Sequence, residues 1–305
     1  MPGKSKYFFY QVQMRLAELF NRAAGELAEA GVPEYQLDAR LLLESCLGIT
    51  RTEIFLSGQA EVDEEAQQRY LGLIERRKKR EPVAYILGEQ EFWSMPFFVS
   101  PAVLIPRPET EFLLDRVLAL TSPENRGRGC ALDLCCGSGV IATVLARETG
   151  MKIIASDISF KALQVARKNL HRHHLADQVR LVQGDLLTPF LQTGDVFSLI
   201  VSNPPYVSND DVENGLEPEV ARHEPHLALD GGAGGLALIQ EIRLRLPAVL
   251  CPGGQFFMEI GADQGEAVQS LFTADLKDAP GFCDVEILAD YTGRDRVLHA
   301  RKKKL

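Results

Sequence analysis

The pattern of hydrophobic and polar positions changes character twice along this chain of 305 residues. In residues 1–85, apolar positions recur at the spacing of one helix face, and no alternating strand pattern interrupts them. The clearest run is Leu16, Leu19, Phe20 and Ala23. Gly31 and Gly48 interrupt the pattern where helices are expected to end. We therefore predict a small all-helical bundle for this part.

Residues 86–108 follow a different pattern, in which aromatic and β-branched residues stand between prolines. Pro96, Pro101 and Pro106 limit how far any strand can extend, because proline donates no backbone hydrogen bond. This part is expected to form a β-hairpin that links two domains.

In residues 109–305, strand-like and helix-like stretches alternate, which predicts a parallel sheet covered by helices. Three elements are expected late in this part: a helix at 234–250, a strand at 255–260 after a turn at Gly253-Gly254, and a helix at 262–272. The last two strands, 285–288 and 296–300, have no helix between them. They are expected to pair antiparallel at an edge of the sheet.

A candidate ligand-binding turn follows the strand 130–134. The chain continues there as Cys135-Cys136-Gly137-Ser138-Gly139 and opens into an apolar helix. Backbone N–H groups and the positive end of such a helix face a bound ligand. The glycine spacing alone also fits a nicotinamide-dinucleotide site. Asp157, at the end of the next strand, suits ribose hydroxyls in either kind of protein.

The most informative motif is Asn203-Pro204-Pro205-Tyr206, here called the clamp, which follows the apolar strand 197–201. Proline has a fixed φ and no N–H, so this loop offers carbonyl acceptors without competing donors. The Asn203 side-chain oxygen and the Pro204 carbonyl can accept both hydrogens of an NH2 group. Such a site suits a nitrogen nucleophile beside a bound electrophile, as in a methyltransferase, whereas a hydride-transfer enzyme has no use for it.

Composition and charge narrow the function further. The net charge is −9, with 42 acidic and 33 basic residues, which argues against a nucleic-acid substrate. The basic clusters 76–80 and 301–304 are interpreted as solvated ends of elements. No apolar run reaches membrane length and no signal peptide is recognisable, so we expect a cytoplasmic protein without membrane contact. The six cysteines indicate neither disulfides nor a metal site.

Four further motifs accompany the clamp: residues 81–88 (EPVAYILG), 103–111 (VLIPRPETE), 229–232 (LDGG) and 293–296 (GRDR). These motifs are spread over nearly the whole chain, which resembles the peptide chain release factor glutamine methyltransferases, the PrmC/HemK family. The resemblance implies a class I methyltransferase-like (Rossmann-like) sheet with an antiparallel C-terminal strand, after a helical substrate-recognition domain and the hairpin. It also implies S-adenosylmethionine as methyl donor, and the Gln of the Gly-Gly-Gln motif in class 1 release factors as acceptor.

The resemblance and the motifs together give a set of expected site residues. Those expected to bind the cofactor are Asp133, Cys135, Cys136, Gly137, Ser138, Gly139, Asp157, Asp185, Leu186 and Asn203. Those expected to act in catalysis or to bind substrate are Asn203, Pro204, Pro205, Tyr206, Arg107 and Phe97. The family has Gly where this chain has Cys135. If Cys135 has ordinary backbone angles, the turn is expected to survive this difference.

The six histidines are interpreted as surface or capping residues, and none is assigned as a base. Release factors are expected as the protein partner, and the chain is expected to be a monomer that does not bind nucleic acid directly. One alternative is an amino-methyltransferase acting on adenine or guanine, because the clamp could hold an exocyclic amine equally well. Another is a non-catalytic binding module on the same fold, although this chain retains both the clamp and the glycine turn. A dinucleotide oxidoreductase is the weakest alternative.

Overall fold

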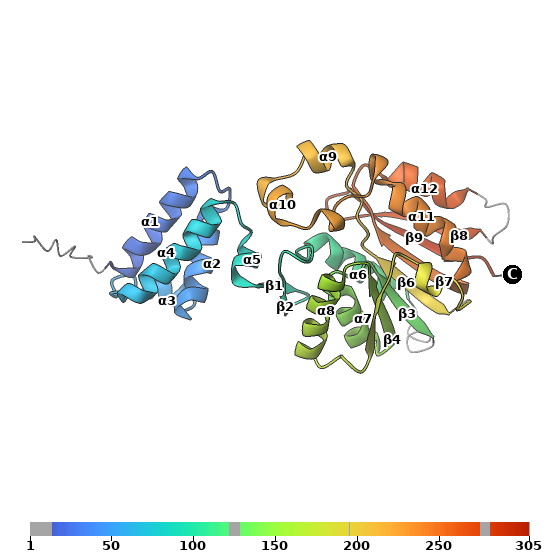
Figure 1. Cartoon of the computed structure of the whole chain (residues 1–305), viewed down its shortest axis with the longest axis horizontal. Coiled ribbons are helices and arrows are strands. Elements are labelled where there is room, and N and C mark those ends of the chain that lie inside the picture. The colour runs from blue at the N-terminus through green and yellow to red at the C-terminus, as the bar shows by residue number, and fades with distance from the viewer. Residues whose placement is uncertain (1–13, 122–128, 195, 275–280, 305) are drawn as a thin grey trace, which may run out of the picture. The chain divides into compact units, whose positions relative to one another are not determined.

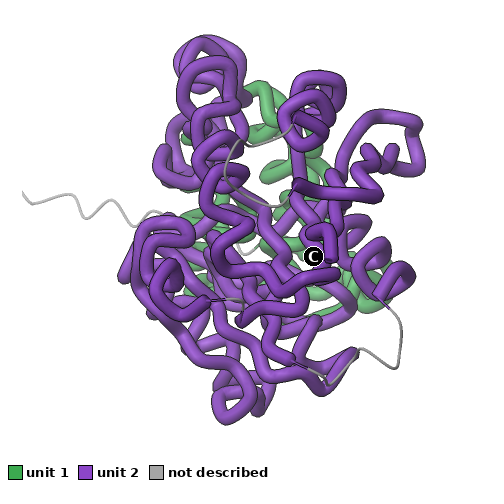
Figure 2. Tube along the Cα trace, turned by 90° about the vertical axis from the view of Figure 1, so that its right-hand side faces the viewer, with its two compact units in different colours: residues 1–87 green, residues 88–305 purple. Residues whose placement is uncertain are grey.

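The computed structural model describes residues 14–121, 129–194, 196–274 and 281–304. The chain divides into two compact units, residues 1–87 and 88–305, which are coloured separately in Figure 2. The first residues of the expected helical part, 1–13, lie outside the described ranges. The hairpin belongs to the second unit by its contacts.

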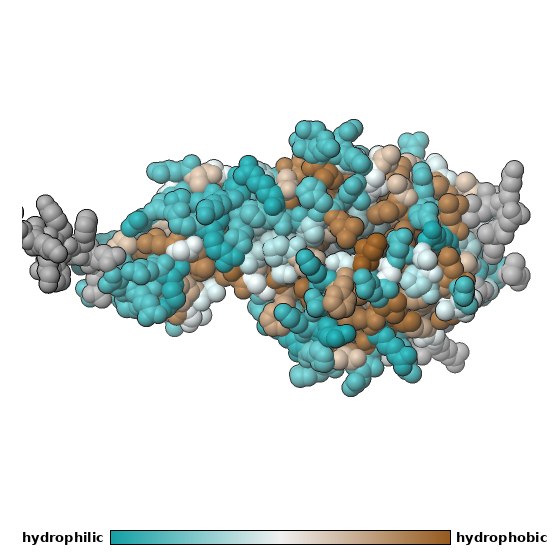
Figure 3. All heavy atoms as spheres, viewed as in Figure 1, coloured by the Kyte–Doolittle hydropathy of each residue, from teal (hydrophilic) through white to brown (hydrophobic). Residues whose placement is uncertain are grey.

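The first unit consists of helices, as predicted. They are α1 (Leu16–Glu29), α2 (Tyr35–Leu47), α3 (Arg51–Leu56), α4 (Glu64–Lys78) and α5 (Val83–Leu87). Apolar faces with helical spacing meet in one core, in which Leu19, Leu42 and Tyr70 are fully buried. The side of this unit seen in Figure 3 is mostly hydrophilic, with some apolar side chains at the surface.

The helix ends of this unit follow local chemistry. The Asp63 side chain accepts a hydrogen bond from the Ala66 N–H at the start of α4. Gly48, with φ +66°, ends α2 in the left-handed region. Part of the basic cluster 76–80 occupies the last turn of α4, where positive charge interacts favourably with the helix dipole.

The second unit opens with the hairpin, β1 (Glu89–Phe92) and β2 (Met95–Phe98), and then α6 (Pro108–Leu120). Seven strands form one sheet: β3 (Cys130–Leu134), β4 (Lys152–Asp157), β5 (Val179–Gln183), β6 (Phe197–Ser202), β7 (Leu250–Glu259), β8 (Phe282–Ala289) and β9 (Asp295–Lys302). Their order is β5-β4-β3-β6-β7-β9-β8. The first five are parallel, and β9 runs antiparallel to both of its neighbours. The prediction of an antiparallel C-terminal pair at the sheet edge is therefore confirmed.

Helices cover both faces of the sheet (Figure 1). One face packs against α6, α7 (Val140–Thr149) and α8 (Phe160–Arg172), and the other against α11 (Ala237–Arg245) and α12 (Gly265–Thr273). Successive strand residues supply the two cores in turn, because side chains alternate between the faces of a sheet. In β6, Leu199 and Val201 enter the first core and Ile200 enters the second.

Two expectations about the late elements were wrong in detail. The expected helix at 234–250 is shorter, because α11 ends at Arg245 and a short 3-10 turn, Leu246–Ala248, follows it. Gly253 and Gly254 do not form a turn before the strand. They lie inside β7, where the register against β6 shifts between Phe197 and Leu199.

Two short helices that the sequence did not suggest, α9 (Asn209–Asn214) and α10 (Pro218–His223), follow the clamp. No helix in the described ranges is long and apolar enough to cross a bilayer.

A buried ion pair provides a test of how the first unit is stabilised. Arg77 Nε lies 2.7 Å from Asp38 Oδ2, and both side chains are buried. We expect Asp38→Asn to lower the free energy of unfolding by about 3 kcal/mol, because it replaces a charged partner of the buried Arg77 guanidinium with a neutral amide. Glu65→Gln is the control, since it breaks the exposed Arg69–Glu65 pair and should cost less than about 1 kcal/mol. Denaturant unfolding followed by circular dichroism measures both, and equal losses would contradict the prediction.

Candidate active site

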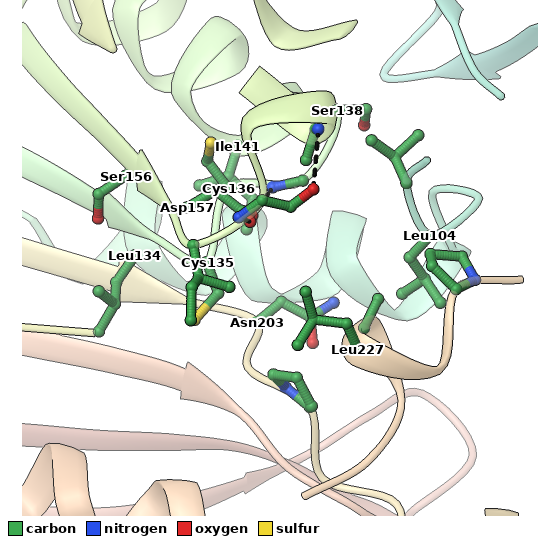
Figure 4. A pocket seen from close by; sticks show the side chains of 18 of the residues that line it. Leu104, Leu134, Cys135, Cys136, Ser138, Ile141, Ser156, Asp157, Asn203 and Leu227 are labelled. Carbon is green, nitrogen blue, oxygen red and sulfur yellow. Dashed lines mark hydrogen bonds between the residues drawn. The ribbon is translucent and has the colours of Figure 1, made fainter. Parts of the chain in front are cut away.

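A cavity lies in the second unit at the carboxyl ends of the parallel strands. It encloses about 1110 Å³ of space between protein atoms, including the part open to solvent. Its walls come from the loops after β3, β4, β5 and β6, from the loop before α6, and from the segment after α10. Figure 4 shows Cys135, Asp157 and Asn203 among the side chains around it. This is where open α/β sheets bind ligands.

The glycine turn forms as the sequence predicted. Gly139 has φ +78° and stands directly before α7, so the first N–H groups of that helix follow the turn. A Cβ on Gly139 would lie 3.1 Å from the Ala166 Cβ, which explains why α8 can pack so closely here. Gly137 also has positive φ, and Gly137 and Ser138 both line the cavity. The Ser138 carbonyl accepts a hydrogen bond from Asn169 Nδ2, which fixes the turn against α8.

Cys135 does not have the ordinary backbone angles with which the turn was expected to survive, yet the turn forms. Its φ is +62°, in the left-handed region that glycine occupies without strain. Its side chain lines the cavity, as does that of Cys136, whose N–H donates to the Ser156 carbonyl on β4. Burial raises the pKa of both thiols, so both are neutral near pH 7 and neither is a thiolate nucleophile.

Asp157 ends β4 at the cavity. Its carboxylate accepts hydrogen bonds from the Gly137 N–H (2.9 Å) and the Ser159 N–H (2.8 Å), while burial raises its pKa. These bonds tie the ends of β3 and β4 together and fix the direction of the carboxylate. Asp185 and Leu186, after β5, also line the cavity, with Asp185 exposed and Leu186 buried.

Asp133 and Gly139 are expected cofactor residues that do not line the cavity. Asp133 is fully buried. Its Oδ2 accepts a hydrogen bond from the Ala142 N–H in the first turn of α7, and its Oδ1 has no hydrogen-bond partner. Burial raises the pKa of Asp133 to about 8. Asp133 therefore stabilises the start of α7 behind the glycine turn.

The clamp follows β6, and a chain of hydrogen bonds holds it from behind. Asn203 Nδ2 donates to Thr110 Oγ1 (3.1 Å), and Thr110 Oγ1 donates to Glu259 Oε2 (2.7 Å). The Tyr206 hydroxyl donates to Glu259 Oε1 (3.0 Å). Asn203 and Pro205 line the cavity, whereas Pro204 is buried. Sequence reasoning missed Thr110 and Glu259, although an acid ending a strand of apolar residues was a usable signal.

Arg107 lines the cavity and forms an ion pair with Glu224, a residue the sequence analysis did not single out. The Glu224 side chain is buried and also accepts a hydrogen bond from the Ile105 N–H (3.2 Å). These contacts attach the segment after α10 to the loop before α6. Pro225 and Leu227 of that segment line the cavity directly.

Phe97, like Pro204 and Tyr206, is an expected substrate residue that does not line the cavity. Its ring is fully buried against Phe92 and His173, because alternate residues of β2 face the core. Phe98, on the opposite face, lies beneath the Arg172 guanidinium instead. His299 was expected to be a surface or capping residue, but it is buried in β9 with its ring stacked on Phe257.

The sheet order, the glycine turn and the clamp at one edge together define a class I methyltransferase. Two solved structures support the fold. A methyltransferase from Pyrococcus furiosus aligns with 70% of this chain and 91% of its own chain, with a TM-score of 0.50 and 19% identity. The hMettl16 catalytic domain in complex with MAT2A 3'UTR hairpin 6 aligns with 80% of this chain and 83% of its own, with a TM-score of 0.53 and 15% identity. Family models match residues 18–88 (PrmC N-terminal domain) and 110–254 (Methyltransferase small domain).

Full-length relatives identify the family. The release factor glutamine methyltransferase of Caulobacter vibrioides is 40% identical over 96% of this chain and 98% of its own length. The protein of the same name from Koribacter versatilis is 40% identical over 95% and 99%. The chain belongs to the release factor glutamine methyltransferase family.

The cofactor of these enzymes is S-adenosylmethionine, and the residues around the cavity fit it. The Asp157 carboxylate at the end of β4 can accept from ribose hydroxyls. Cys135 to Ser138 line the neighbouring wall, and Asp185 and Leu186 line the wall after β5, where an adenine could bind. Asn203 and Pro205 line the wall after β6.

The left-handed conformation of Cys135 leads to a prediction about stability. Cys135→Gly removes the Cβ that makes φ +62° unfavourable, whereas Cys135→Ala keeps that Cβ and removes only the sulfur. We expect the glycine variant to be more stable than the alanine variant by about 1 kcal/mol. Urea unfolding of the two variants measures the difference. An alanine variant as stable as the glycine variant would show that the turn carries no strain at this position.

The buried Asp133 carboxyl leads to a prediction about pH. Its pKa rises from 3.8 to about 8 on folding, so the folded protein binds its proton more tightly than the unfolded chain. Its contribution to stability is therefore complete below pH 3.8 and is lost as the pH rises towards 8. We expect Asp133→Asn to gain stability relative to the native protein between pH 5 and pH 8, by at least about 1 kcal/mol. Urea midpoints at the two pH values test this, and a difference independent of pH would contradict it.

Proposed function

We propose that this protein transfers a methyl group from S-adenosylmethionine to the side-chain amide nitrogen of the Gln in the Gly-Gly-Gln motif of class 1 peptide chain release factors. The names of its full-length relatives support a release factor glutamine as the acceptor. The observation that carries the proposal in the structure is the clamp. Asn203 reaches the cavity with its NH2 group bonded to Thr110, which leaves its oxygen available to a substrate.

An amide nitrogen is a poor nucleophile, because its lone pair is delocalised into the carbonyl group. In the proposed reaction, Asn203 Oδ1 and the Pro204 carbonyl accept the two hydrogens of the substrate NH2. These two acceptors orient the nitrogen and place partial negative charge beside it as it becomes pyramidal and positive. S-adenosylmethionine, when bound, supplies a methyl group activated by a positively charged sulfur.

The remaining residues of the clamp orient the substrate. The Tyr206 hydroxyl is engaged by Glu259 and is therefore not available to the substrate, so we propose that the ring packs against the substrate amide. Pro205 lines the cavity beside Asn203 and presents an apolar surface. Arg107, held by Glu224, forms part of the wall that the substrate passes.

No strong base is required, because an N-methylated, protonated amide is very acidic and loses its proton to water. The positions of the histidines are compatible with this proposal. His173 follows the last residue of α8 and packs on Phe97, and His299 lies within the sheet. Neither lines the cavity.

A protein substrate must place one Gln in a narrow site, which needs more contact area than the cavity offers. We propose that the helical unit, residues 1–87, supplies this second surface. We further propose that the protein acts as a monomer in the cytoplasm, where release factors are made.

Mass spectrometry of a purified, unmethylated class 1 release factor tests the proposal. After incubation with the protein and S-adenosylmethionine, we expect a gain of one methyl group that maps to the Gly-Gly-Gln glutamine. Asn203→Ala is expected to lower kcat/KM by about 100-fold, the cost of removing one well-placed acceptor or donor at a reacting centre.

Asn214→Ala is the matched control, because Asn214 is an exposed asparagine of α9 and should leave the rate unchanged. Unmethylated release factor in the presence of demonstrated cofactor binding would overturn the proposal. The amines of adenine and guanine in nucleic acid would then be the next acceptors to test.

A further inference from the structure

The buried side chains behind the clamp form a route of successive hydrogen bonds from the end of one strand to the cavity. Glu259 is the last residue of β7 and Asn203 follows β6, its parallel neighbour, in which Ser202 pairs with Met258. Thr110, in the first turn of α6, lies between them. Thr110 and Glu259 are almost completely buried, with exposures of 3% and 0%. Only Asn203 and Thr110 of these three line the cavity.

The direction of each hydrogen bond in this route follows from the donors available. The hydroxyls of Thr110 and Tyr206 each donate to one oxygen of Glu259, so the single hydrogen of the Thr110 hydroxyl is used in that bond. The Thr110 oxygen is then left as an acceptor, and it can bond only to the NH2 end of Asn203. Asn203 Oδ1 is thereby directed away from Thr110. In the part of the chain that the structure describes, no hydrogen bond reaches this oxygen.

We infer that Glu259 is a positioning residue that acts through Thr110 to hold the Asn203 oxygen towards the substrate. The site then presents an acceptor, and it selects nucleophiles that carry an NH2 group. This inference rests on the proposed methylation of an amide nitrogen. Tyr206 shares the same carboxylate, so Glu259 orients both ends of the clamp.

Neutralising Glu259 would reverse the order of donors. The NH2 of a glutamine at this position can donate to Thr110, whose hydroxyl hydrogen is then free to turn towards Asn203. Asn203 would be favoured in the flipped orientation, with its NH2 group facing the NH2 of the substrate. Two donors facing each other cannot form a hydrogen bond, so the clamp would no longer hold the nucleophile.

A matched pair at Thr110 tests the route without changing any charge. Thr110→Val keeps the shape of the side chain and removes the hydroxyl, whereas Thr110→Ser keeps the hydroxyl. We expect the valine variant to lose at least about tenfold in kcat, which corresponds to one lost hydrogen bond at the reacting centre. The serine variant is expected to retain at least about a third of the native kcat.

Glu259→Gln is expected to lower kcat by at least about tenfold as well, with Glu266→Gln as the control for one lost negative charge at an exposed acid. Cofactor affinity is expected to stay within about twofold in Glu259→Gln, since a loss of tenfold needs 1.4 kcal/mol and Glu259 does not line the cavity. A purely structural role would instead lower stability and cofactor affinity together. A valine variant with native kcat, or a serine variant as impaired as the valine variant, would overturn the inference.

A second measurement does not depend on methyl transfer. The side-chain NH2 signals of Asn203 can be assigned in NMR spectra by their loss in Asn203→Ala. We expect these hydrogens to exchange with water more slowly in the native protein and Thr110→Ser than in Thr110→Val. Equal exchange rates would refute the positioning role even if the native enzyme methylates its substrate, whereas slow exchange without methylation would reject only the proposed function.

Discussion

The site depends on the parallel register of four neighbouring strands. β4, β3, β6 and β7 pair in the same direction, so their carboxyl ends meet at one edge of the sheet. That edge brings together Asp157, the glycine turn, the clamp and Glu259, which are far apart in sequence. A shift of one residue in any of these pairings would turn each side chain to the opposite face. The alternating apolar residues of β6, divided between two cores, therefore also set the direction of Asn203.

The parts of the fold that follow from local pattern were predictable. Helical spacing in the first unit, alternation in the second, and two strands without a helix between them gave the right classes of element. The glycine turn and the clamp were found because their chemistry is contained in consecutive residues. Contacts between residues that are far apart in the sequence could not be predicted. Thr110 is separated from Glu259 by 149 positions and Arg107 from Glu224 by 117, and no periodicity relates such pairs.

Backbone conformation was a second limit. The residue types in the turn do not indicate that Cys135 takes φ +62°, because cysteine has no preference for the left-handed region. The parallel strands and the start of α7 impose the angle, and the surrounding bonds, such as that from the Cys136 N–H to Ser156, maintain it. Phe97 is a comparable case: two adjacent phenylalanines face opposite sides of a strand, and only the fold decides which side is the core.

Burying the Glu259 carboxylate is unfavourable by itself, since an acid loses its hydration and its pKa rises. Replacing such a buried polar cluster as a whole by well-packed hydrophobic residues is often neutral or stabilising. The carboxylate is instead held by two hydroxyl donors, from Thr110 and Tyr206, which satisfy both of its oxygens. A buried polar network with every member bonded fixes one arrangement, because each alternative leaves a donor or acceptor unpaired. The stability lost at Glu259 is thus consistent with a site that must present one particular oxygen to its substrate.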